Sequence, residues 1–228
     1  MKILSRSNVR DAQTVDYVDS SANAGQKVLR NTYMLLSMTL LFSALTAGAS
    51  VAFSLPSPGI IITLVGYFGL LFLTTKLRNS AWGIASVFAL TGFMGMTLGP
   101  IISRYLAMPG GSSIVMSAMG LTGIIFMGLS AYVLISKRDF SFMSGFLMIG
   151  MLVAFVASLG AIFFQIPALS LTISAVMVLL MSGMILFETS NIIRGGETNY
   201  IMATVSLYIT IFNLFTSLLH LLGFIEKE

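Results

Sequence analysis

The sequence has very little charge and no cysteine. Only 9% of its 228 residues are charged and 57% are hydrophobic, whereas a soluble domain carries about 25% charged residues. Such a chain could not cover its surface against water, so it is predicted to be an all-α, polytopic membrane protein. The absence of cysteine excludes disulfides, thiolate metal sites and cysteine nucleophiles.

Residues that catalyse hydrolysis inside membranes are also scarce. A zinc protease needs an H-E-x-x-H motif, but His220 is the sole histidine. A serine protease needs a serine beside a general base, and Ser144 and Ser182 lie in small-residue motifs typical of helix contacts. An aspartyl protease needs two intramembrane aspartates. All four aspartates lie outside the hydrophobic runs: Asp11, Asp16, Asp19 and Asp139. We therefore expect no enzyme activity, no cofactor and no metal site.

Seven hydrophobic runs are long enough to cross a membrane, which takes about 20 apolar residues. The first thirty residues hold no short apolar core, so we expect a retained first span rather than a cleaved signal peptide. The bundle is expected over 31–225, with a short C-terminus at 226–228. The expected spans are 31–54, 58–75, 81–102, 113–135, 143–165, 168–188 and 200–224.

Two connections between spans are short and contain proline, which ends one helix before the next begins. They are "LPSPG" at 55–59 and "QIPAL" at 165–169. Both predict tight helical hairpins, one of the first and second spans and one of the fifth and sixth.

The basic residues indicate the orientation, because cytosolic loops are enriched in Lys and Arg. Ten fall on the side of the N-terminus and two on the other side. We therefore expect a cytosolic N-terminus and, after seven crossings, a C-terminus on the outer side of the membrane. Charges spread over short loops form no continuous patch, which argues against nucleic acid as a partner. The ten are Lys2, Arg6, Arg10, Lys27, Arg30, Lys76, Arg78, Lys137, Arg138 and Arg194; the two are Arg104 and Lys227.

Small residues indicate where helices approach closely within the bundle. Gly95 and Gly99 form a G-x-x-x-G pair followed by Pro100, a pattern typical of close helix contacts in membranes. We predict a packing contact and a kink here. The sixteen methionines are interpreted as bundle filler rather than as a metal relay.

Glu188 is the carboxylate that lies closest to the middle of a hydrophobic stretch. It is expected about 8 Å from the end of the sixth helix, where it could face Thr210 or Asn213 of the seventh. Ionisable groups inside membranes are candidates for functional sites. The alternative is that Glu188 reaches cytosolic water or pairs with a basic residue: Lys76, Arg78 or Arg194.

Several stretches together resemble the Bax inhibitor family of seven-helix membrane proteins. The resemblance covers roughly residues 27–224 in order, which makes it highly specific. It is carried by "KVLRNTYMLLS" (27–37), "LPSPG" (55–59), "TGFMGMTLGPI" (91–101), "SAYVLISKRDFSF" (130–142) and "LFETSNIIRGGETNYIMATVSLYITIFNLF" (186–215).

The resemblance implies a particular role for Glu188. Members of the family that leak calcium in a pH-gated manner carry one aspartate in the sixth span and one in the seventh. Glu188 matches the first position, but Thr210 occupies the second. A threonine cannot provide like-charge coupling or a second anionic ligand. A pH-dependent calcium or proton leak with Glu188 as the titrating residue is therefore the alternative function, and Lys76 and Arg78 match the family's basic cluster.

The resemblance also implies a location, the bacterial inner membrane with the C-terminus in the periplasm, and a partner, the membrane-bound ATP-dependent protease FtsH. Bacterial members close to this chain are described as modulators and slow substrates of FtsH, engaged by the cytosolic tail. Residues 1–30 are polar and expected to be disordered. The charged residues assigned to this partner-binding tail are Lys2, Arg6, Arg10, Asp11, Asp16 and Asp19.

Overall fold

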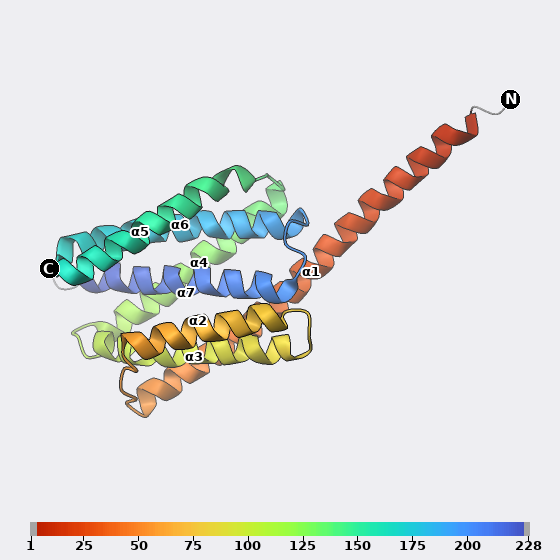
Figure 1. Cartoon of the computed structure of the whole chain (residues 1–228). Coiled ribbons are helices and arrows are strands. Elements are labelled where there is room, and N and C mark those ends of the chain that lie inside the picture. The colour runs from red at the N-terminus through yellow and green to blue at the C-terminus, as the bar shows by residue number, and fades with distance from the viewer. Residues whose placement is uncertain (1–3, 226–228) are drawn as a thin grey trace.

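A computed structural model describes the backbone of residues 4–225 and the side chains of residues 25–161 and 163–225. Throughout the described backbone the structure is helical, without strands. Within the described residues, seven helices are long and apolar enough to cross a membrane, which confirms the predicted all-α, seven-span architecture (Figure 1). They are α1 Leu4–Ala52, α2 Ile60–Leu77, α3 Trp82–Leu106, α4 Gly111–Ser136, α5 Ser144–Phe164, α6 Pro167–Ile193 and α7 Tyr200–Ile225, with a 3₁₀ turn, η1, at Ser141–Met143.

α6 extends beyond the expected span end at 188 to Ile193, so Glu188 lies inside the helix, as expected. α1 begins at Leu4, whereas the sequence predicts a disordered tail over 1–30; its membrane-spanning part is Gly25–Ala52. The charged tail residues lie outside the described side chains, so their partner-binding role stays a prediction.

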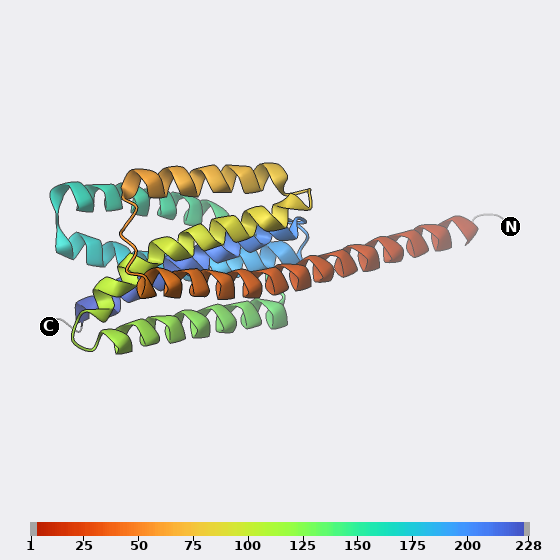
Figure 2. The ribbon, with the colours of Figure 1, turned by 90° about the horizontal axis from the view of Figure 1, so that it is seen from below.

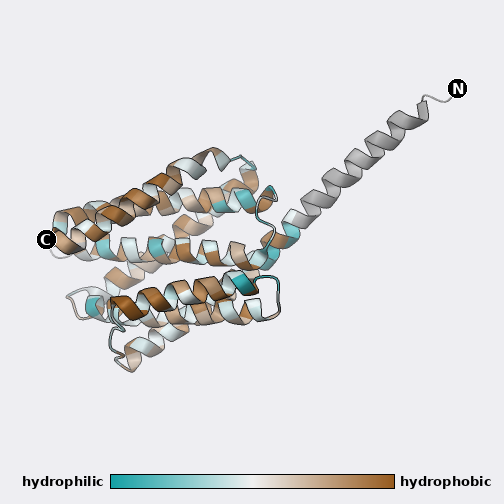
Figure 3. Ribbon diagram, in the orientation of Figure 1, coloured by the Kyte–Doolittle hydropathy of each residue, from teal (hydrophilic) through white to brown (hydrophobic). Residues whose placement is uncertain are grey.

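The loops divide the bundle into two ends. We call "the basic end" the one that carries the α2–α3, α4–α5 and α6–α7 loops, and "the far end" the one where the described chain ends. Hydrophilic residues gather in the loops of the basic end, whereas α2 and α5 are mainly hydrophobic (Figure 3).

α3 and α7 form the interior of the bundle, whereas α2 and α5 lie outside it. In the most apolar stretch of α3 and of α7, half of the residues are buried. The corresponding share is 6% for α2 and 11% for the span that includes α5. α7 contacts α1, α3, α4 and α6. The buried apolar side chains of the bundle form two clusters, and α7 contributes residues to each of them. The polar residues of α7 are therefore placed where several helices meet.

α1 and α3 pack closely because glycines remove side chains from the contact. A Cβ added at Gly95 would meet Ser43 and Thr46, and one added at Gly99 would meet Ser50. These glycines are the predicted G-x-x-x-G pair, and the structure places them against α1.

Pro100 lies inside α3, which continues beyond it to Leu106. Proline has no N–H, so the carbonyl of Met96, four residues earlier, lacks its usual helical donor. The Ser50 hydroxyl of α1 donates a hydrogen bond of 3.0 Å to that carbonyl. Gly99 gives Ser50 the room to do so, and glycine, proline and serine thus form one structural unit.

The expected hairpin of α1 and α2 is wrong. α2 packs on α3 and shares no substantial contact with α1; α3 lies between them (Figure 2). The glycine face of α3 accepts α1 closely, and the connection at 53–59 is long enough to lead the chain past α3. The expected hairpin of α5 and α6 is present, since these two helices pack directly on each other.

Candidate functional site

Three consecutive polar residues are buried near the C-terminal end of α6. Glu188 is 8% exposed, Thr189 is fully buried and Ser190 is 2% exposed. Successive residues of a helix point about 100° apart, so each of the three faces a different part of the bundle.

Glu188 faces α7, where the Thr210 hydroxyl donates a hydrogen bond of 3.1 Å to Glu188 Oε2. Lys76 and Arg78 are exposed. Within the described side chains the one ion pair joins Arg194 to Asp139, and it does not include Glu188. Of the partners considered from the sequence, the structure thus places Thr210, rather than a basic residue, against Glu188.

Asn213 lies almost one turn further along α7 and is not joined to this contact. Its side-chain amide donates to the Ile209 carbonyl of the same helix at 2.9 Å. The polar pair between α6 and α7 therefore consists of Glu188 and Thr210.

Thr189 and Ser190 connect α6 to other elements. The Thr189 hydroxyl lies 3.4 Å from the Tyr33 hydroxyl of α1 and 3.5 Å from the Ser130 hydroxyl of α4. Ser190 donates to the Arg138 carbonyl and accepts from the Phe140 N–H. The end of α6 is thus hydrogen-bonded to α1, α4, α7 and the α4–α5 loop.

Arg194, directly after α6, extends this contact with the α4–α5 loop. It forms an ion pair of 3.6 Å with Asp139 and donates to the Lys137 carbonyl at 3.1 Å. Hydrogen bonds from Ser141, with a smaller contribution from the charge of Arg194, lower the pKa of the exposed Asp139 carboxyl below its usual value.

A cavity of about 150 Å³ lies beside Glu188. The side chains of Asn191, Glu197 and Ser206 also line it. Sequence reasoning missed Glu197 because it lies in a loop after two glycines, where a carboxylate is interpreted as solvated. The loop folds back, however, and brings this second carboxylate to the same cavity as Glu188.

Asn199 is a second residue that sequence reasoning missed. Its side-chain oxygen accepts from the N–H groups of Ile201 and Met202 at 3.0 and 3.1 Å, which caps α7. Its side-chain nitrogen donates to the Arg78 carbonyl and to Asn79. An asparagine just before an apolar run is a recognisable capping signal, but its link to the α2–α3 loop requires the tertiary fold.

Together these features define the class of the protein: a seven-helix membrane protein with a buried carboxylate between its last two helices. The chain belongs to the Bax inhibitor family, because residues 25–227 match the family described as "Inhibitor of apoptosis-promoting Bax1".

Bacterial relatives are similar over nearly their whole length. A protein of Escherichia coli K12 named "Modulator of FtsH protease YccA" is 57% identical over 202 residues, covering 89% of this chain and 92% of the relative. An uncharacterized protein of Pseudomonas aeruginosa is 55% identical over 215 residues, covering 92% and 97%. An uncharacterized membrane protein of Vibrio cholerae is 49% identical over 203 residues, covering 89% and 91%.

Proposed function

We propose that this chain is an inner-membrane regulator that binds the protease FtsH, is itself a slow substrate through its N-terminal tail, and thereby limits degradation of other membrane proteins. The observation that carries the proposal is the 57% identity over 202 residues with a protein named as a modulator of FtsH. In this role the chain acts by binding and has no catalytic activity of its own.

The distribution of basic residues supports engagement by the tail. Ten Lys and Arg residues on one side against two on the other favour a cytosolic N-terminus and a periplasmic C-terminus. An ATP-dependent protease works on the cytosolic side, where it would meet residues 1–30. A polar tail of this length has an extended reach of roughly 100 Å.

The packing of α1 supports slow rather than rapid degradation. A protease that pulls on the N-terminus has to separate α1 from α3 first. The separation would expose the close contacts at Gly95 and Gly99 and break the hydrogen bond from Ser50 to the Met96 carbonyl. It would also break the 2.6 Å hydrogen bond between Ser43 of α1 and Tyr208 of α7.

The proposal is tested with purified FtsH and this chain in proteoliposomes. Association and ATP-dependent loss of the chain are measured for the intact protein, for a version lacking residues 1–25, and for a control lacking residues 226–228. The tail deletion is expected to abolish turnover, whereas the C-terminal deletion leaves it unchanged. Equal turnover of all three proteins would contradict engagement by the tail.

One observation favours a second candidate, a pH-dependent cation leak. Glu197 lines the same cavity as Glu188 and thus provides a second carboxylate beside it, although not at the position of Thr210. The test is calcium or proton flux into vesicles that contain the intact chain. Flux abolished by Glu188→Gln and by Glu197→Gln would favour this candidate, and absence of flux with the intact chain would exclude it.

A further inference from the structure

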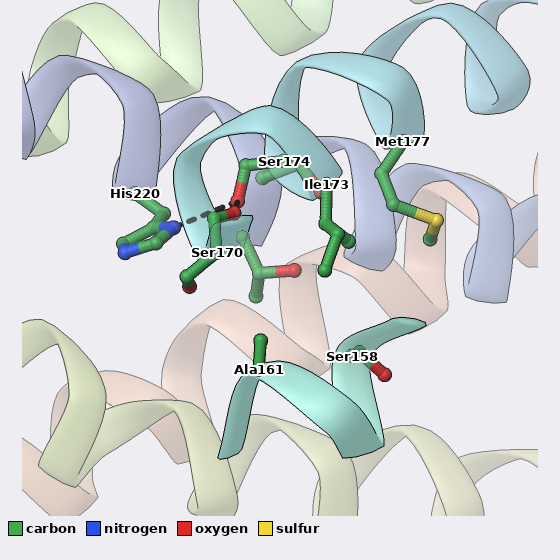
Figure 4. A pocket seen from close by; sticks show the side chains of 9 residues that line it. Ser158, Ala161, Ser170, Ile173, Ser174, Met177 and His220 are labelled. Atoms are coloured by element: carbon green, nitrogen blue, oxygen red, sulfur yellow. Dashed lines mark hydrogen bonds between the residues drawn. The ribbon is translucent and has the colours of Figure 1, made fainter. Parts of the chain in front are cut away.

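A second cavity lies at the far end, away from Glu188. It has a volume of about 320 Å³ and lies between α5, α6 and α7 (Figure 4). Five hydroxyl groups and one imidazole line it, together with three apolar side chains. The polar lining residues are Ser158, Ser170, Ser174, Thr216, Ser217 and His220.

The polar lining of the cavity lies at a depth in the membrane where lipid tails offer it no hydrogen bonds. His220 lies five residues and Thr216 nine residues before the last residue of α7, which places them roughly 7 and 13 Å below the helix end. The hydrocarbon core of a bilayer is about 30 Å thick, so the cavity reaches into the outer part of that core. Lipid tails cannot form hydrogen bonds with hydroxyl groups at this depth.

The hydrogen bonds of the lining determine what it offers to a ligand. Ser158 donates to the Phe155 carbonyl at 2.7 Å, Ser174 to the Ser170 carbonyl at 3.0 Å, and Thr216 to the Phe212 carbonyl at 3.0 Å. A hydroxyl has one hydrogen and two lone pairs. These three hydroxyls have therefore used their hydrogens and present acceptor oxygens.

His220 pairs with one of these hydroxyl groups, that of Ser174. His220 Nδ1 lies 2.7 Å from Ser174 Oγ (Figure 4). In the tautomer that carries its hydrogen at Nδ1, His220 donates to Ser174, whose own hydrogen goes to the Ser170 carbonyl. His220 thereby fixes the orientation of one of the acceptor oxygens.

Two further hydroxyls remain available to a ligand. Throughout the described side chains, no hydrogen bond joins the hydroxyl of Ser170 or Ser217 to another residue. Each can accept a hydrogen bond or donate one. Among the five hydroxyls, acceptor positions thus outnumber donors.

The lining excludes two classes of occupant. Among the residues that the structure describes, the lining contains no Lys or Arg, and the N–H groups of the surrounding helices are occupied within the helices, so an anion would find few donors. An apolar occupant would leave the hydroxyls of Ser170 and Ser217 without partners, which is unfavourable for polar groups out of contact with water. A group with several N–H donors can donate hydrogen bonds to the acceptor oxygens of the lining.

We propose that this cavity binds a primary ammonium group, supplied by the head group of an aminophospholipid or by a free amine. The cavity, with a volume of about 320 Å³, is large enough for an ethanolammonium group, and it lies in the outer part of the core, next to the head-group region. Several hydroxyl oxygens would accept hydrogen bonds from the one ammonium group.

The test compares ligands that differ in their N–H donors. The midpoint of thermal unfolding of the intact chain in detergent is measured with short-chain phosphatidylethanolamine and with short-chain phosphatidylcholine, whose trimethylammonium group has the charge but no N–H. Ethanolamine and choline form the second pair. Stabilisation by phosphatidylethanolamine alone assigns a lipid source, and stabilisation by ethanolamine as well shows that the free amine suffices. If no donor-bearing ligand exceeds its methylated counterpart, the proposal is overturned.

Variants distinguish this cavity from other lipid contacts. Thr216→Val keeps the shape of the side chain but removes its hydroxyl, and Ser174→Ala removes the other hydroxyl. Each variant is expected to weaken retention of phosphatidylethanolamine about tenfold. Ser182→Ala is the matched control, since Ser182 of α6 makes the same kind of bond, to the Val178 carbonyl at 2.7 Å, but does not line the cavity. Retention is measured by native mass spectrometry at a temperature where every variant is folded. Equal loss in all three variants, or loss in none, would overturn the assignment.

Discussion

Gly99 is the position where a single added methyl group tests the contact between α1 and α3 most sharply. A Cβ at Gly99 would meet the Ser50 side chain and lie 3.2 Å from the backbone carbonyl carbon of Ser50. The backbone of α1 cannot move aside as the end of a flexible side chain can, so overpacking should cost about 1–3 kcal/mol. Alanine recovers up to about 1 kcal/mol of helix propensity, which leaves Gly99→Ala destabilising by about 1 kcal/mol.

Gly120 of α4 provides the matched comparison. A Cβ there has no atom within 4 Å, so Gly120→Ala is expected to be neutral or to stabilise the bundle by up to about 1 kcal/mol. The two variants should therefore differ by roughly 2 kcal/mol, or about 30-fold in the unfolding equilibrium.

The assay for this pair is reversible unfolding in mixed micelles with increasing sodium dodecyl sulfate, followed by circular dichroism. Gly99→Ala should unfold at a lower fraction of dodecyl sulfate than the parent, and Gly120→Ala at the same fraction or a higher one. If Gly99→Ala unfolded together with Gly120→Ala, the close contact between α1 and α3 would be refuted.

Three further predictions concern single polar contacts. Ser50→Ala removes the donor to a carbonyl left unpaired by proline and should destabilise the bundle by about 1 kcal/mol in the same unfolding assay. The control Ser37→Ala, at an exposed site, should not destabilise it. Equal effects of the two substitutions would contradict the role of Ser50. Asn199→Ala removes the cap of α7 and should cost about 1 kcal/mol; hydrogen exchange at the start of α7 would then rise, and unchanged exchange would count against the cap. The pKa of Asp139 is lowered in the folded protein by its bonds from Ser141 and by Arg194, so its contribution is present above about pH 4 and is lost as the pH falls through that lowered value. Hydrogen exchange in the α4–α5 loop should increase over this acidic range in the parent but not in Asp139→Asn, and identical profiles would contradict the assignment.

Features that depend on span length and residue spacing could be predicted from the sequence. Seven apolar runs predict seven helices because a membrane leaves no other way to satisfy the backbone. A contact of Glu188 with Thr210 or Asn213 could be predicted because α6 and α7 are antiparallel neighbours joined by a short loop, but the choice of Thr210 required the structure.

Features that depend on which helices pack together could not be predicted from the sequence. The prolines after α1 indicate where that helix ends, but its partner is selected by the glycine face of α3. Glu197 reaches the Glu188 cavity only through the path of the α6–α7 loop. The pairing of Ser174 with His220 joins residues 46 positions apart, for which no spacing rule exists.

The most direct test of the proposed regulation is the rate at which purified FtsH degrades a second membrane protein in proteoliposomes. The rate is measured without this chain, with the intact chain, and with the version that lacks residues 1–25. The proposal predicts that the intact chain slows degradation and that the shortened chain does not. Equal rates in all three preparations would contradict it.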